Sequence, residues 1–181
     1  MAPQGNRCHA AFSGDLAPAL MVLGAEVEIA GSGGRRRIAL SDLYAEDGQA
    51  HLMLADDELL VAVFLPPDAP PSGYLKARVR GGIDFPLAGV AVALGVENDV
   101  VNTLRVALTG TNSRPFLLAE TESFHGMPLN QAALQRLDKL VQKQVQPMRT
   151  TLASAQYRRL AAAALACRLA ARLFEAAGLP T

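Results

Sequence analysis

The sequence predicts an α+β protein in which a three-stranded antiparallel sheet carries a C-terminal helical layer. Two apolar, valine-rich runs, Phe85 to Leu94 and Val100 to Leu108, are typical of paired strands. Beyond Asn130 the apolar positions recur at helical spacing instead. Strands followed by helices, rather than alternating with them, indicate the α+β class.

The first predicted element is a short helix from Asp15 to Gly24. Ser13 or Asp15 can cap its free N–H groups, and Gly24 supplies a stop. Pro18 falls in the first turn, where proline is tolerated. The apolar side chains expected on one face of this helix are Leu16, Leu20 and Leu23.

Strand signals fill most of the remaining first half. Alternating polar and apolar residues predict a hairpin of two strands, 25–30 and 35–40, around a glycine-rich turn. A serine or aspartate cap allows a short helix to begin at residues 41–44. The β-branched run 58–65 predicts a further strand, which two prolines close.

Residues 68–73 form the best linker candidate of the chain. Their prolines and glycine cannot continue a helix or a hydrogen-bonded ladder. The sequence therefore predicts two parts, residues 1–67 and residues 74–181.

The second part holds the predicted sheet and helical layer. A first strand is possible from Tyr74 to Val79, and the two valine-rich strands are joined by a turn over 95–99. Helices are predicted over 130–146 and 154–177, with proline or glycine at their ends.

Composition argues against several classes of protein. The 17 Lys and Arg balance 17 Asp and Glu, and the only basic run is Arg35 to Arg37, whereas nucleic acids and anionic membranes need clustered cations. Two cysteines make no disulfide framework, and the N-terminus lacks a secretory pattern. No apolar run reaches the roughly 20 residues that span a bilayer. These features predict a cytoplasmic protein.

The unaided sequence offers few candidate sites. The three histidines are far apart and no Cys-x-x-Cys pair occurs, so no metal-ligand cluster is visible. The polar loop 109–113 could contact a cofactor, although a simple turn after a strand is the favoured interpretation. Cys167, in an alanine-rich helix, is expected to be a small buried residue.

Charged residues gather beside the predicted domain boundary, where ligand sites are common. Lys76, Arg78 and Arg80 share one strand face by period two, and Asp84 follows a Gly-Gly break. A ligand site and an ordinary charged surface strand explain these residues equally well.

The order of motifs resembles the FAD-binding subunits of molybdenum hydroxylases, the xanthine dehydrogenase and carbon monoxide dehydrogenase group. Four segments resemble family motifs in the family's order. They are Ser13–Val27 ("SDLxxALxALGAxV"), Glu58–Pro66 ("GElIxxxxxP"), Tyr74–Leu94 ("FxKxxxRxxxDxAxVxVAxxL") and Ser154–Leu160 ("SAEYRRHL"). The resemblance implies a partial FAD-binding subdomain over 1–67 and a flavoprotein C-terminal-type domain over 74–181.

Two further segments, Asn6–Asp15 and Ile83–Pro86, look like the β subunit of the 4-hydroxybenzoyl-CoA reductase branch. That branch carries FAD and an extra [4Fe-4S] cluster on four cysteines, of which Cys8 would match the last. The resemblance implies that the other three cysteines, and the loops that hold the FAD pyrophosphate, would precede Met1. The sequence is thus expected to be either a truncated form or a reduced paralogue.

This departure has consequences that can be tested. One thiolate cannot assemble a four-iron cluster, so Cys8 is expected to be a free thiol or a residual ligand. Loss of the pyrophosphate cradle removes donors that offset phosphate charge. FAD affinity should therefore be weak or absent, and the chain is expected to be colourless.

The resemblance also implies roles in a flavin site. Asp15 would accept a hydrogen bond from the flavin or ribityl group, although it could also serve as a helix cap. Leu60 would pack on the isoalloxazine, with plain core burial as the favoured alternative. Lys76 and the loop to Asp84 would line the flavin face.

The function implied by the resemblance is electron transfer between FAD and iron-sulfur and molybdopterin subunits, without membrane or nucleic acid. In the reductase branch, the complex removes a phenolic hydroxyl reductively, in aromatic degradation. Two hypotheses from other classes stay open: a non-catalytic docking module that lacks FAD, and a small-ligand binding protein that uses the cleft between its halves.

Overall fold

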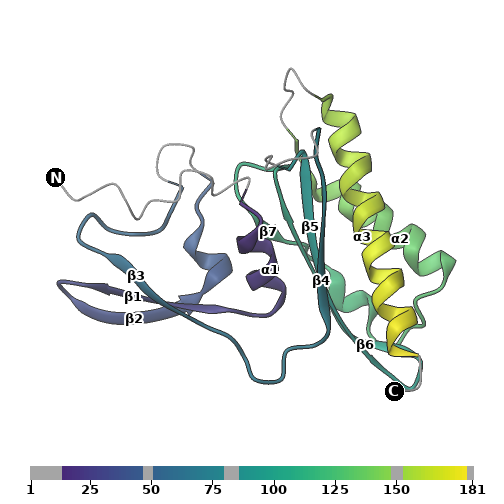
Figure 1. The fold of residues 1–181 in the computed structure, drawn as a ribbon, viewed down its shortest axis with the longest axis horizontal. Helices are drawn as coiled ribbons and strands as arrows, with labels where there is room; N and C mark the ends of the chain where they lie inside the picture. The colour runs from purple at the N-terminus through teal and green to yellow at the C-terminus, as the bar shows by residue number, and fades with distance from the viewer. Residues whose placement is uncertain (1–13, 47–50, 80–85, 148–152, 179–181) are drawn as a thin grey trace.

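The computed structural model describes residues 14–46, 51–79, 86–147 and 153–178. These residues form two antiparallel sheets, three α-helices and two 3-10 helices. Figure 1 shows the small sheet, helix α1, the larger sheet and the pair α2 and α3 following one another across the molecule. The predicted α+β class is confirmed.

The small sheet has the order β2-β1-β3. Its strands are β1 (Glu26–Gly31), β2 (Gly34–Ala39) and β3 (Leu59–Phe64). The predicted hairpin is therefore present, and the third strand pairs on the other side of β1. Helix α1 (Leu16–Val22) precedes this sheet, and the 3-10 helix η2 (Leu40–Leu43) follows β2.

The larger sheet has the order β4-β5-β6-β7. Its strands are β4 (Ser72–Ala77), β5 (Ala88–Glu97), β6 (Val100–Thr109) and β7 (Phe116–Leu117). The sheet contains the three predicted strands and a fourth strand, β7. With only two residues, β7 is too short to show the alternation of polar and apolar residues that predicts a strand. Strand β4 also begins two residues earlier than predicted, so the end of the predicted linker belongs to the sheet.

The turn between β5 and β6 is shorter than the predicted 95–99. Strand β5 continues to Glu97, and only Asn98 and Asp99 turn the chain, with φ of 51° and 59°. Asparagine and aspartate tolerate the left-handed region that a two-residue hairpin turn requires.

The two faces of β5 carry side chains of different size. Val90, Val92 and Leu94 join the large core beneath the helices, whereas Ala91 and Ala93 face α1. Period-two alternation places these sets on opposite faces of the strand. The small side chains allow α1 to pack closely on β5 and β6.

The helical layer covers the other face of the larger sheet (Figure 1). It consists of α2 (Gln131–Gln144) and α3 (Ala155–Ala177), and the 3-10 helix η3 (Thr121–Phe124) lies against β6. The side chain of Asn130 accepts a hydrogen bond from Ala133 N at 3.0 Å, and Ser154 accepts one from Tyr157 N at 3.1 Å. Both helices thus begin beside a side-chain cap at the first residue of their predicted ranges.

Removing the α3 cap should lower the free energy of unfolding by about 1 kcal/mol. In Ser154→Ala the N–H of Tyr157 loses its intramolecular acceptor. Urea denaturation followed by circular dichroism measures this effect. Gln156→Ala, at an exposed position of the same turn, is the control and should cost less than about 0.5 kcal/mol. Equal effects of the two changes would show that the cap contributes nothing.

Candidate functional site

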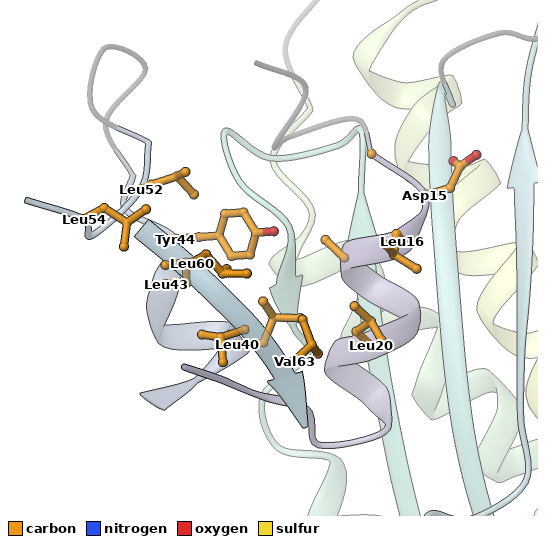
Figure 2. A pocket seen from close by; sticks show the side chains of 13 residues that line it. Asp15, Leu16, Leu20, Leu40, Leu43, Tyr44, Leu52, Leu54, Leu60 and Val63 are labelled. Atoms are coloured by element: carbon orange, nitrogen blue, oxygen red, sulfur yellow. The ribbon is translucent and has the colours of Figure 1, made fainter. Parts of the chain in front are cut away.

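An apolar pocket of about 320 Å³ lies between α1, η2 and β3. Figure 2 shows leucines reaching into it from these separate elements, with Asp15 at the end nearest β4. The side chains that line it include Leu16, Leu20, Leu40, Leu43, Tyr44, Leu52, Leu54, Leu60 and Val63. An apolar wall with a polar group at one end is typical of ligand pockets.

Local sequence explains how each wall forms. Leu16 and Leu20 are four residues apart on α1 and so share its face, as predicted. On β3, Val63 pairs with Val27 and Leu60 with Ile29, so both point to the inner side of the small sheet. The wall remains accessible, because Leu16 is 69% and Val63 is 44% exposed.

Asp15 marks the polar end of the pocket. Its Oδ1 accepts a hydrogen bond from the Tyr74 hydroxyl at 2.6 Å, and its Oδ2 accepts one from Lys76 Nζ at 2.5 Å. Tyr74 and Lys76 are two residues apart on β4 and therefore share the strand face that looks toward α1. The predicted side-chain cap by Asp15 is wrong, because its carboxylate turns to β4 and makes no hydrogen bond to the helix.

The same contacts fix the protonation of this cluster. Burial disfavours the Asp15 carboxylate, but hydrogen bonds from Lys76 and Tyr74 and the charges of Lys76 and Arg78 outweigh it and lower the pKa of Asp15. Burial, with the hydrogen bond to Asp15 and its charge, raises the pKa of Tyr74 far above the ordinary range. Asp15 is therefore ionised and Tyr74 protonated at neutral pH.

Three of the predicted site residues come together here. Asp15 and Leu60 line one pocket, and Lys76 reaches it through its contact with Asp15. Leu60 is partly buried and packs against the apolar cluster that includes α1, so its flavin contact stays a prediction beside its role in the core. Asp84 and Cys8 lie outside the described residues. Sequence reasoning missed Tyr74, whose only signal was its place two residues before Lys76 on a predicted strand.

Other candidate residues have structural roles. In loop 109–113, Asn112 bonds both Gln144 O and Gln146 N, which ties the loop to the end of α2. The Cys167 thiol donates to Leu134 O, and burial with the nearby Asp138 charge raises the pKa of this thiol to about 11. Such a thiol is unreactive at neutral pH. In the part of the chain that the structure describes, no group of three or more His, Cys, Asp or Glu is placed to hold a metal.

Polar side chains around the glycine-rich turn between β1 and β2 contact carboxylates. Ser32 donates through both its backbone N and its hydroxyl to Asp57, and Arg36 pairs with Glu58 at 2.8 Å. Arg35 and Arg37 likewise pair with Glu28 and Glu26. Each arginine of the basic run is thus exposed and faces a carboxylate, as is typical of a charged protein surface.

The pocket fits the ring of a large heterocycle better than a phosphate chain. Its apolar walls suit an aromatic face, and the Asp15 cluster gives one end a fixed polar group. At the glycine-rich turn, by contrast, Ser32 and Arg36 donate to the carboxylates of Asp57 and Glu58, whose negative charge disfavours a phosphate chain there.

Comparison with known proteins assigns the fold to a family. The model described as the CO dehydrogenase flavoprotein C-terminal domain matches residues 73–173, more than half of the chain. The chain belongs to the CO dehydrogenase flavoprotein family. A second model, described as the FAD binding domain in molybdopterin dehydrogenase, matches residues 3–68. FAD is therefore the family cofactor, and the resemblance carried by the motifs is confirmed at this level.

The curated relatives of this chain are named as a medium subunit and a medium chain. The nicotine 6-hydroxylase medium subunit of Paenarthrobacter nicotinovorans is 32% identical over 106 residues, covering 59% of this chain and 36% of the relative. The carbon monoxide dehydrogenase medium chain of Afipia carboxidovorans is 26% identical over 156 residues, covering 85% of this chain and 54% of the relative. The chain thus spans about half or less of the length of these relatives.

Solved structures share its fold. Quinoline 2-oxidoreductase from Pseudomonas putida 86 matches 97% of this chain with a TM-score of 0.84 at 22% identity, over 61% of its own chain. Cu,Mo-CO dehydrogenase matches 94% with a TM-score of 0.84 at 26% identity, over 60% of its own chain. Among the described helices, none combines the length and apolar character needed to cross a membrane.

Proposed function

We propose that this chain forms the part of a molybdenum hydroxylase flavoprotein subunit that holds the flavin ring of FAD. The observation that carries the proposal is the leucine-lined pocket with Asp15 at its polar end. Family membership supports FAD as the ligand, because both family models describe flavoproteins.

Each side chain would have a distinct task in this site. Leu60 and the leucines of α1 and η2 would pack on the ring and exclude water from its apolar part. Asp15, with Lys76 and Tyr74, would present a fixed charge at the polar end. Asp84, in the loop after Lys76, is proposed to line the flavin face or to act on its electrostatic environment. FAD, when bound, supplies the electron-transfer chemistry, and the protein sets its position and nearby charge.

We further propose that the subunit is cytoplasmic and assembles with an iron-sulfur subunit and a molybdopterin subunit in a heterotrimer. The names of the relatives, a medium subunit and a medium chain, support an assembly of several subunits. We propose 4-hydroxybenzoyl-CoA reductase as the specific type, on the motifs at Asn6–Asp15 and Ile83–Pro86. Cys8 is then the candidate cluster ligand. Iron analysis of the purified complex, with and without Cys8→Ser, tests that assignment.

The alternative is a docking module that lacks FAD. The pocket side chains would contact a flavin ring, but Ser32 and Arg36 at the glycine-rich turn donate to Asp57 and Glu58, and these carboxylates would disfavour a phosphate there. A free dinucleotide would then be held weakly. Flavin binding discriminates the two functions, since a docking module needs no ring pocket.

Shortening the Leu60 side chain, which would contact the ring, should weaken flavin binding about tenfold. Removing a half-buried leucine side chain loses about 1–1.5 kcal/mol of apolar contact. The change is Leu60→Ala, and quenching of lumiflavin fluorescence by the purified chain gives the dissociation constant. Lumiflavin contains the ring without phosphates, so this titration tests the pocket alone.

Leu59→Ala is the matched control. Leu59 neighbours Leu60 on β3 but does not line the pocket, and it is 51% exposed. Its removal should leave the lumiflavin dissociation constant unchanged. If the unmodified chain shows no saturable quenching, the proposed function is wrong, and equal losses in both variants would remove Leu60 from the site.

A further inference from the structure

Tyr74 occupies a space that only glycine leaves open. In the register of β4 and β5, Lys76 pairs with Gly89, so Gly89 lies diagonally beside Tyr74. A Cβ at position 89 would stand 2.3 Å from the Tyr74 hydroxyl and 2.6 Å from Thr109 Cγ2. Neither distance is compatible with a real carbon atom, so any other residue would displace the hydroxyl.

The hydroxyl placed in this way reaches Asp15 at 2.6 Å. The tyrosine ring packs against the apolar cluster that includes α1, which restricts its motion. Tyrosine has two side-chain torsions, whereas lysine holds its charge on a flexible four-carbon stem. The rigid donor on Asp15 is therefore Tyr74, and Lys76 supplies charge.

Asp15 needs such a donor because the helix does not hold it. It stands at the start of α1 without a capping hydrogen bond, and its side chain is 44% exposed. The groups that face it are Tyr74 and Lys76, with the charge of Arg78 close enough to act on it. Without the tyrosine hydroxyl, the carboxylate could swing about its remaining contact with Lys76.

We propose that Tyr74 is a positioning residue of the flavin-ring site, whose hydroxyl, seated against Gly89, fixes the Asp15 carboxylate at the polar end of the pocket. This inference rests on the proposed function for its ligand. The tyrosine stays a donor at ordinary pH, because burial and the Asp15 charge keep it protonated. The substitution Tyr74→Phe removes only the oxygen and keeps the ring that packs on α1.

The experiment combines two readouts on the full chain. The pKa of Asp15 is measured by carbon NMR without ligand, and the lumiflavin dissociation constant is measured by fluorescence. In Tyr74→Phe the pKa of Asp15 should rise toward its ordinary value, and lumiflavin should bind about tenfold more weakly, as expected for loss of a hydrogen bond to a charged group. Gly89→Ala should reproduce both changes while retaining the tyrosine.

A double-mutant cycle separates positioning from general damage. In an Asp15→Asn background, Tyr74→Phe should change lumiflavin affinity by less than twofold. A tenfold loss in that background, or an unchanged pKa of Asp15 in Tyr74→Phe, would overturn the proposal. If the unmodified chain binds no lumiflavin, the flavin function fails, and the pKa of Asp15 still decides separately whether Tyr74 fixes this carboxylate.

Discussion

Replacing Phe124 with alanine should lower the free energy of unfolding by about 3–5 kcal/mol. Phe124 is completely buried and belongs to the large core between the sheet and the helices. It comes from η3, which packs on β6, and the Arg136 guanidinium lies 5.2 Å from its ring centroid. Truncation would leave a cavity where β6 and the helical layer meet, and the neighbouring strands cannot collapse into it.

Urea denaturation, with far-UV circular dichroism as the signal, measures this loss. Met127→Ala is a suitable control, because Met127 follows Phe124 closely in the chain but is 38% exposed. The control should cost less than about 1 kcal/mol. If Phe124→Ala were no more destabilising than the control, η3 would be a surface loop rather than the element that closes the core.

Much of the larger sheet and its helices follows from sequence periodicity. The valine-rich runs of β5 and β6 pair as predicted, and both long helices begin at a side-chain cap, Asn130 or Ser154. These features are local, because the apolar periodicity of an element, its capping residue and the residue that ends it are all close together in the sequence. The β7 strand escaped prediction, since two residues are too few to show a period.

The pocket could not be predicted from spacing alone. Its walls come from α1, η2 and β3, and the residue that fixes its polar end, Tyr74, lies on a different sheet. Asp15 illustrates the limit: its position before a helix predicts a cap, but tertiary contacts to β4 take its carboxylate instead. The motif resemblance selected Asp15, Leu60 and Lys76 because it carries information about three-dimensional neighbours that periodicity lacks.

The small side chains of β5 should matter as much for the site as for the fold. Ala91 is completely buried, pairs in register with Tyr74 and Ala107, and faces α1. Ala91→Leu adds three carbons to this closed contact. We expect it to lower the free energy of unfolding by about 2 kcal/mol, because overpacking shifts side chains from their preferred rotamers.

The same substitution should move α1 away from the sheet. Asp15 and Leu20 travel with α1, so the polar end and one wall of the pocket would shift together. Lumiflavin affinity should then fall by about tenfold or more, since misplacement by a fraction of an ångström loosens a site. Phe124→Ala, which acts on the opposite face, should leave the affinity of the folded fraction unchanged.

Ala164→Leu controls for the added volume, because Ala164 lies exposed on α3. It should change both the free energy of unfolding and the lumiflavin dissociation constant only slightly. If Ala91→Leu lowered stability yet bound lumiflavin as the unmodified chain does, α1 would not form a wall of the ligand site. The narrow alanine face of β5 would then serve packing alone, and the pocket seen between α1 and β3 would not be where the flavin ring binds.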